Sequence, residues 1–203
     1  MSKIVVFNNL TLDGVMQAPG RPDEDRRGGF EYGGWATPYA TMEAAEESKA
    51  YTGALLLGRR TYEDFYAVWP NRTDNPFTAV LNNTQKYVAS TTLEEPLSWS
   101  NSTLLKGDAA EAVTRLKGEP GKDLVILGSG ELVQSLMRRN LVDEYVLLIH
   151  PLVLGSGRRL FADGGAFAAL RLVDTKTTTT GVVIATYQLA EPAARKTTDA
   201  AMP

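Results

Sequence analysis

The residues of this chain that could bind a charged ligand lie first in two glycine turns about 70 residues apart, each between an apolar run and an expected helix. The first turn is Gly58-Arg59-Arg60-Thr61 and the second is Gly128-Ser129-Gly130. A helix N-terminus presents unpaired backbone N–H groups and the positive end of the helix dipole, so it attracts phosphate. Arg59 adds a planar set of donors that suits phosphate. Two such turns in one small domain indicate a ligand with several phosphates, most simply a dinucleotide.

The composition excludes several other classes of site. The 203 residues suit one domain, and 43% hydrophobic with 22% charged residues is typical of a globular protein. A net charge of -3 argues against a general nucleic-acid binder. The chain has no cysteine and one histidine, His150, which excludes thiolate and multi-histidine metal sites. No apolar run reaches the roughly 20 residues of a membrane helix, and the N-terminus lacks a signal-peptide pattern, so we expect a cytoplasmic protein with no membrane partner.

Apolar runs and helix signals alternate along most of the chain, which predicts an α/β fold with a mostly parallel mixed sheet and a C-terminal antiparallel hairpin. We expect one domain over residues 1–190 and a loose tail over 191–203. The expected strands are 4–10, 54–57, 77–81, 86–90, 124–127 and 145–149, with a closing hairpin of 170–175 and 181–189. The expected helices are 38–51, 60–67, one capped by Asp108 that runs through Lys117, and 131–140.

Residues 17 to 35 form a long glycine- and proline-containing loop. Loops of this length are usually functional lids or disordered segments. Phe30, Tyr32 and Trp35 favour a lid that packs on the rest of the domain, since disordered segments contain few aromatic residues. Trp35 could stack on a flat substrate or anchor the loop, and the sequence leaves both open.

Three familiar site patterns are absent. The second turn lacks the third small residue of a Rossmann fingerprint, because position 133 is Val. Neither turn is followed by the Gly-Lys-Ser or Gly-Lys-Thr of a phosphate-binding P-loop. No Gly-x-Ser-x-Gly nucleophile elbow occurs, and a single histidine next to proline is a poor base for a hydrolase triad.

A series of short motifs together carries a family resemblance over about residues 3 to 190. They are Thr11-Leu12-Asp13-Gly14, Gly58-Arg59-Arg60-Thr61-Tyr62-Glu63, Val88-Ala89-Ser90-Thr91-Thr92-Leu93, Leu127-Gly128-Ser129-Gly130-Glu131-Leu132, Leu141-Val142-Asp143-Glu144-Tyr145 and His150-Pro151-Leu152-Val153-Leu154-Gly155-Ser156-Gly157. In this order they resemble the dihydrofolate reductase-like superfamily. They look specifically like stand-alone relatives of the C-terminal reductase domain of the bifunctional riboflavin-biosynthesis deaminase/reductase.

The resemblance implies a three-layer dihydrofolate reductase-like fold that binds NADPH. The adenosine phosphates would be held by the first turn and the end of the next strand, the pyrophosphate by the second turn, and the nicotinamide would lie near Asn9 and Met16. The implied cofactor-binding residues are Asn9, Met16, Gly58, Arg59, Thr61, Ser90, Thr91, Gly128, Ser129, Gly130, Glu131 and Leu132. The alternatives are a surface ion pair for Arg59 and a strand-end cap for Ser90 and Thr91. The family often joins two glycines by a cis peptide where this chain has Gly128-Ser129, which leaves the cis bond open.

The expected function is hydride transfer from NADPH to a small, flat, polar substrate such as a pterin or ribosylaminopyrimidine. The folate branch binds its substrate with a helix carboxylate at a position that here is Met42, so we assign substrate binding or proton relay to the adjacent Glu43, with a solvated helix face as the alternative. Trp35 is the second candidate substrate-binding residue. Other readings are a non-catalytic NADPH-binding module and a structural dimer subunit without cofactor. The resemblance also implies a homodimer.

Overall fold

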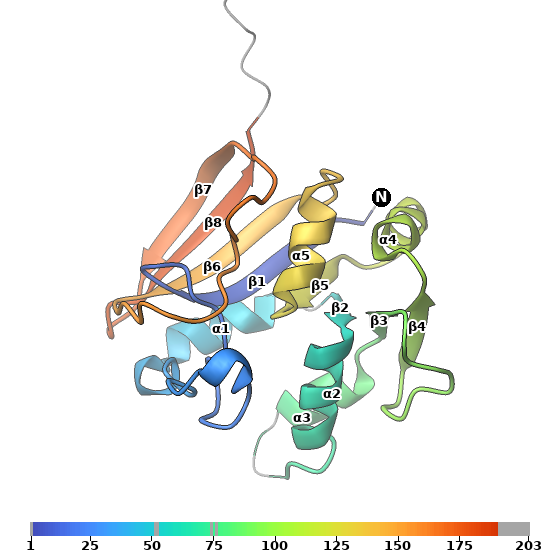
Figure 1. The fold of residues 1–203 in the computed structure, drawn as a ribbon, viewed down its shortest axis with the longest axis horizontal. Helices are drawn as coiled ribbons and strands as arrows, with labels where there is room; N and C mark the ends of the chain where they lie inside the picture. The colour runs from blue at the N-terminus through green and yellow to red at the C-terminus, as the bar shows by residue number, and fades with distance from the viewer. Residues whose placement is uncertain (1, 51–52, 74, 76, 191–203) are drawn as a thin grey trace, which may run out of the picture.

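The computed structural model describes residues 2–50, 53–73, 75 and 77–190, so the expected tail 191–203 lies outside the described residues. Figure 1 shows the elements along the chain. The strands are β1 (Ile4–Thr11), β2 (Ala54–Gly58), β3 (Lys86–Ser90), β4 (Ser102–Lys106), β5 (Leu124–Leu127), β6 (Glu144–His150), β7 (Leu170–Thr177) and β8 (Val183–Leu189). The helices are α1 (Met42–Ala50), α2 (Arg59–Val68), α3 (Phe77–Asn83), α4 (Ala109–Gly118) and α5 (Gly130–Met137), with short 3-10 turns at Arg27–Gly29 and Thr37–Tyr39.

The eight strands form one sheet in the order β4-β3-β2-β5-β1-β6-β8-β7. The first six strands of this order pair in parallel, while β6–β8 and β8–β7 pair antiparallel. The predicted mostly parallel sheet with a C-terminal antiparallel hairpin is therefore confirmed. Parallel pairing brings the carboxyl ends of β1, β2, β3 and β5 to one edge of the sheet, where the loops of the site begin.

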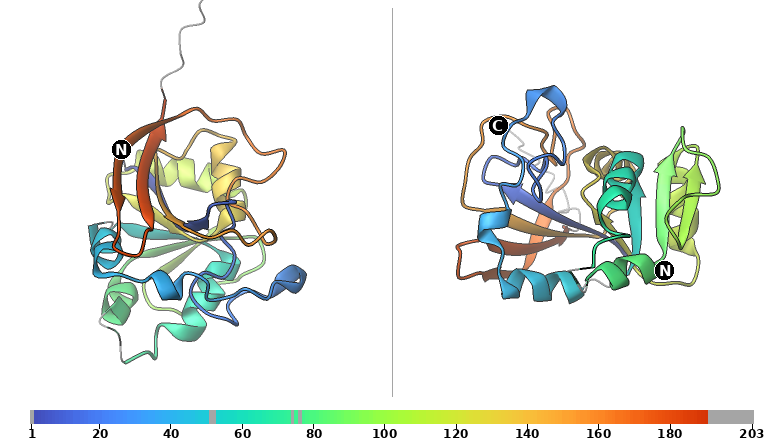
Figure 2. Two further views of the ribbon diagram at one scale, coloured as in Figure 1. Left: turned by 90° about the vertical axis from the view of Figure 1, so that its left-hand side faces the viewer. Right: turned by 90° about the horizontal axis from the view of Figure 1, so that it is seen from below.

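Helices cover both faces of the sheet, which gives three layers (Figure 2). Successive strand residues point to opposite faces. On β1, Ile4 and Val6 pack with α4 and α5, while Val5 and Phe7 pack on the face covered by α3 and by Tyr62 of α2. Both clusters are continuous and almost fully buried, so the sheet edge that carries the site is held from two sides.

The predicted strand 77–81 is wrong, because these residues open helix α3. Asn75 accepts the Phe77 N–H at the start of this helix. At its other end Lys86, fully buried on β3, donates from Nζ to Leu81 O and Thr84 O at 2.7 Å and lies 4.5 Å from the centre of the Trp99 ring. Contacts distant in sequence thus satisfy both ends of a short helix that its apolar pattern does not reveal.

Two other expected boundaries change. The predicted helix 38–51 divides into the 3-10 turn Thr37–Tyr39 and α1, because Ala40 is extended and the Thr41 hydroxyl accepts the Ala44 N–H; Tyr51 lies outside the described residues. Strand β4 was not predicted. The expected cap of α4 is confirmed, since Asp108 Oδ1 accepts the Glu111 N–H at 2.9 Å. Within the described ranges, no helix is long and apolar enough to span a membrane.

Candidate functional site

A cleft of about 1760 Å³ opens where β1, β2, β3 and β5 end. All twelve residues to which the sequence assigns cofactor binding line this one cleft, although they come from five separate stretches of chain. They are Asn9, Met16, Gly58, Arg59, Thr61, Ser90, Thr91, Gly128, Ser129, Gly130, Glu131 and Leu132. The predicted substrate residues Trp35 and Glu43 lie outside its wall.

Two helix N-termini face the cleft. Helix α2 begins after Gly58 and α5 after Ser129, and neither has a side chain that caps its own first turn. Apart from the bonds of the glycine turns described below, the backbone N–H groups of the first turn therefore find no acceptor in the described part of the chain. Their positive dipole ends converge on the same space, which suits a ligand that carries more than one anionic group.

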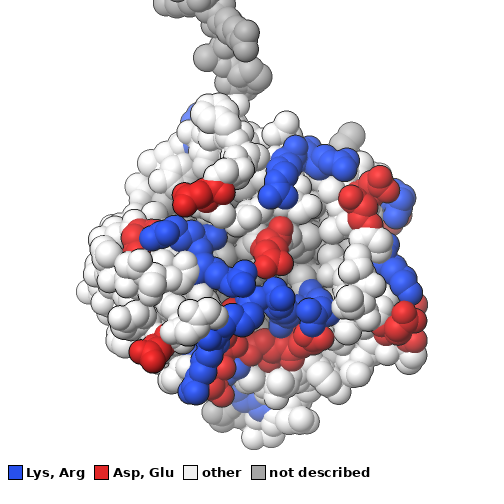
Figure 3. Space-filling model, viewed as in Figure 1, with Lys and Arg blue, Asp and Glu red and all other residues white. Residues whose placement is uncertain are grey.

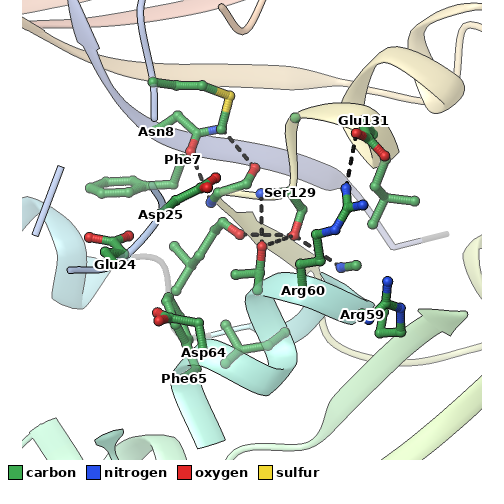
Figure 4. A pocket seen from close by; sticks show the side chains of 18 of the residues that line it. Phe7, Asn8, Glu24, Asp25, Arg59, Arg60, Asp64, Phe65, Ser129 and Glu131 are labelled. Carbon is green, nitrogen blue, oxygen red and sulfur yellow. Dashed lines mark hydrogen bonds and ion pairs between the residues drawn. The ribbon is translucent and has the colours of Figure 1, made fainter. Parts of the chain in front are cut away.

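The Ser129 side chain links the two turns. Ser129 has a left-handed φ of 53°, and its hydroxyl does not cap α5. Its Oγ instead accepts the Gly58 N–H at 3.0 Å and lies 3.0 Å from Thr61 Oγ1, which in turn accepts the Ser129 N–H at 3.2 Å (Figure 4). The first turn of α2 is thus fixed to the first turn of α5. The cis peptide of the described chain joins Glu95 and Pro96, so the Gly128–Ser129 bond is trans.

Asn8 adds a third strand to this arrangement and was missed from the sequence. Its Oδ1 accepts the Gly128 N–H at 2.9 Å, and its Nδ2 donates to Gly128 O at 3.2 Å. The side chain is buried. An asparagine inside a β-branched run is a polar residue where an apolar one is expected, and that is the signal that could have identified it. At Gly130 a Cβ would lie 2.7 Å from Met16 Sδ, so glycine lets Met16 reach the turn.

Arginines surround the cleft. Six of them line it, namely Arg26, Arg27, Arg59, Arg60, Arg158 and Arg159. Figure 3 shows basic side chains gathered across the middle of this face. Arg60 and Arg158 share Glu131, at 3.3 and 3.0 Å, and Arg59 pairs with Glu63 at 2.9 Å. These pairs are solvent-exposed, and exposed pairs contribute little, so an anionic ligand could replace the carboxylates as partner.

For Arg59 and Ser90 the structure also shows the alternative contacts. The Arg59–Glu63 pair is a surface ion pair of the i,i+4 type. The Ser90 hydroxyl accepts the N–H groups of Thr92 and Leu93 at 3.1 and 3.0 Å, which closes the turn after β3. Ser90 retains its hydroxyl hydrogen for donation, and Thr91 beside it is exposed at the cleft.

The predicted lid packs as a small cluster of its own. Phe30 and Trp35 are buried with Val15 and Ala18, and the Trp35 indole donates to Gln17 O at 2.7 Å. This contact anchors the loop, and the substrate-stacking role of Trp35 stays a prediction. On the cleft side, Arg21 donates to Asp64 of α2 at 2.6 Å, so the lid is joined to the helix that carries the first turn.

Among the carboxyl groups, Glu24 lines the cleft and Glu43 does not. Glu43 is exposed on α1, whose Met42 and Ala45 reach the cleft wall. The Glu24 Oε2 accepts the N–H groups of Gly20 and Arg21 at 2.7 and 3.0 Å. Burial raises the pKa of Glu24 despite these two bonds, which favour the ionised form. Glu24 was not singled out in the sequence, because a charged loop residue has no distinguishing pattern.

His150 lies beside the cleft at the end of β6. Its Nε2 is 3.0 Å from Asn9 Oδ1, and its ring meets those of Trp35 and Tyr39 edge-on at 5.1 and 5.5 Å. Its Nδ1 is buried without a hydrogen-bond partner among the described residues. Burial lowers the pKa of His150 to about 4, so the imidazole is neutral at physiological pH. Within the described chain no group of acidic or histidine side chains could hold a metal ion.

Comparison with known proteins adds the family. Residues 2–184 match the model of the RibD C-terminal domain. The chain is similar to two uncharacterized proteins of Bacillus subtilis (strain 168). YyaP is 33% identical over 138 residues, which are 66% of this chain and 72% of YyaP. YwjB is 30% identical over 182 residues, which are 86% of this chain and 91% of YwjB.

Three solved structures share the fold. A Shewanella sp. PV-4 protein named for riboflavin biosynthesis superposes with a TM-score of 0.69 at 20% identity, over 93% of this chain and 99% of that one. A pyrimidine reductase-like protein of Corynebacterium diphtheriae gives 0.64 at 12%, over 94% and 92%. Dihydrofolate reductase of Enterococcus faecalis, complexed with NADP(H), gives 0.58 at 12%, over 93% and 97%. The expected dihydrofolate reductase-like fold is thereby confirmed.

The environment of His150 predicts an unusual titration. The folded-state pKa of about 4 lies below the ordinary 6.5, so between these values the unfolded chain binds more protons. We expect the free energy of unfolding to fall as the pH is lowered from 6.5 to 4, by about 3 kcal/mol at most from this group. Because His150 is the one histidine, its ring proton resonances report the pKa without assignment by mutation. A midpoint near 6.5 would contradict the buried, neutral state.

Proposed function

Because the chain belongs to the RibD C-terminal domain family, we propose that it is an NADPH-dependent reductase that transfers hydride to a small, flat, polar heterocycle of the pterin or ribosylaminopyrimidine type. The family supports a reductase-type activity. The observation that carries the cofactor assignment is the convergence of two uncapped helix N-termini and six arginines on one cleft. NADP(H) is the ligand of the dihydrofolate reductase neighbour, and its several phosphates match this set of donors.

The residues present fit such a cofactor by their chemistry. Arg59, Ser90 and Thr91 offer donors to a 2′-phosphate, and the first turns of α2 and α5 offer N–H groups to the pyrophosphate. Asn9 and Met16 line the part of the cleft that borders β1. The bound cofactor supplies the hydride, while the chain orients the two rings and the lid excludes water.

The preference for NADPH over NADH depends on Arg59 in this proposal. A charge-assisted hydrogen bond contributes about 1.5–3 kcal/mol. Arg59→Ala should therefore weaken NADPH binding roughly ten-fold or more and leave NADH binding nearly unchanged, as measured by fluorescence titration. Arg115→Ala on α4, an exposed arginine outside the cleft wall, is the matched control. An equal loss for both cofactors would argue against a 2′-phosphate contact.

Two other functions remain as alternatives. Stoichiometric NADPH binding without oxidation by any acceptor would favour a non-catalytic module or sensor. Absence of NADPH binding would favour a structural subunit. A screen of pterins and aminopyrimidines by absorbance at 340 nm, after a binding titration, separates the three.

The proton that accompanies the hydride has two candidate sources. Glu43 is the candidate from the sequence, and its exposed position matches the alternative of a solvated helix face. Glu24 is the candidate that the geometry supports, because it lines the cleft and a carboxyl group with a raised pKa suits proton donation.

The isosteric pair Glu24→Gln and Glu43→Gln distinguishes these candidates. Glutamine preserves shape and removes the proton, so the variant of the true donor should turn over at least ten-fold more slowly, about 1.4 kcal/mol of barrier, with NADPH affinity unchanged. We expect this effect for Glu24. A loss confined to Glu43→Gln would restore the sequence assignment, and unchanged turnover in both would assign the proton to water.

We also propose a homodimer, which rests on the family resemblance. The sequence argument that β6 or β8 must leave an exposed edge is wrong, because both are interior and the edges are β4 and β7. Strand β7 is almost entirely exposed and carries Leu172 and Val173 at the surface, so it offers an edge that a second copy could cover. Light scattering at micromolar concentration should give twice the 22.1 kDa chain mass, and a monomer would reject the proposal.

A further inference from the structure

A small side chamber opens from the cleft beneath the lid. Its volume is about 310 Å³, and it shares Phe7, Asn9, Pro19 and Ala45 with the wall of the cleft. The other walls come from the lid, α1 and the ends of β6 and β8. Any group that enters the chamber is therefore continuous with a ligand that lies in the cleft.

The chamber and the cleft differ in charge. Six arginines line the cleft, whereas the described residues around the chamber include no lysine, arginine, aspartate or glutamate. Phe7, Tyr39 and Leu148 contribute flat or apolar walls. A phosphate would lose its hydration there without gaining a cation, so the chamber favours an uncharged ring and leaves any phosphate in the cleft.

Asn9 and His150 supply the polar groups of the chamber that are free to recognise such a ring. An amide oxygen can only accept, so the 3.0 Å contact with Asn9 Oδ1 places the imidazole hydrogen on Nε2. Nδ1 is then a bare acceptor, and it is buried without a partner in the described structure. The Asn9 Nδ2 has no acceptor among the described residues either, so it is a free donor.

A buried acceptor without a partner costs about 1–3 kcal/mol, which a ligand donor would recover. The lowered pKa of His150 supports the same assignment, because a neutral imidazole keeps the Nδ1 lone pair available. The groups that surround the ring are Trp35, Tyr39 and Asn9, none of which is charged.

We propose that this chamber is the ring subsite of the substrate, in which His150 Nδ1 and Asn9 Nδ2 read an adjacent N–H and C=O of a flat lactam-type heterocycle. The proposal rests on the proposed reductase function and narrows its substrate class. It makes His150 a specificity-determining residue and assigns no proton transfer to it. It also orients the substrate, with the ring in the chamber and any phosphate toward the arginines.

Lumazine, a flat bicycle with lactam N–H groups, and 1,3-dimethyllumazine, which lacks them, test the proposal on the full chain. We expect the wild-type protein saturated with NADPH to bind lumazine at least ten-fold tighter by fluorescence titration. With ¹⁵N-labelled histidine, the Nδ1 resonance of the single histidine should move upfield on lumazine binding, as it does when a bare nitrogen accepts a hydrogen bond. This readout requires no variant.

Two substitutions separate recognition from packing. Glutamine reaches the position of Nε2, so His150→Gln keeps the bond to Asn9, lacks the Nδ1 acceptor and should bind both compounds equally. Asparagine reaches the position of Nδ1, so His150→Asn should retain part of the preference. Equal binding of the two compounds by the wild-type protein, binding of neither, or lumazine binding without a shift of Nδ1 would overturn the proposal. Failure to bind NADPH would instead reject the reductase function, since lumazine binding can be measured without cofactor.

Discussion

The contact between Ser129 and the first turn of α2 is the constraint on which the site depends. Two helix N-termini can bind one ligand only if their separation is fixed, and β2 and β5 are joined near this edge by few backbone pairs. The Ser129 hydroxyl accepts the Gly58 N–H, and the Thr61 hydroxyl accepts the Ser129 N–H, so each turn satisfies a donor of the other. Asn8 ties Gly128 to β1 in the same way. The turns therefore bind each other before they bind a ligand, which is preorganisation.

This arrangement divides the backbone donors into two sets. The N–H groups of Gly58, Gly128 and Ser129 hold the turns together, and those further into α2 and α5 stay available. Sequence reasoning treated each glycine turn as one phosphate cradle. The structure separates the donors that build the cradle from those that can contact an anion. A left-handed serine at this position is tolerated because its hydroxyl gains contacts that glycine could not make.

The sequence predicted the sheet well because its strands are short, continuous apolar runs bounded by turn residues, and because caps such as Asp108 lie next to the helices they start. It failed at α3, where buried Lys86 closes the helix from a neighbouring strand. It found the twelve cleft residues through the order of motifs, since these lie in glycine turns. It missed Asn8 and Glu24 because the value of a single polar side chain depends on what the fold places opposite it.

The lid connects parts of the site that the sheet does not. Gln17 accepts the Trp35 indole N–H through its backbone and the Arg158 N–H through its side chain, so the lid is joined to the loop after β6. On the other side Arg21 binds Asp64 on α2. An exposed ion pair is easily broken, whereas the buried aromatic cluster is not. The lid can consequently open on the side of α2 while it stays anchored beside His150. Such an opening would admit a ligand to the cleft without disturbing the chamber or the turns that Ser129 holds.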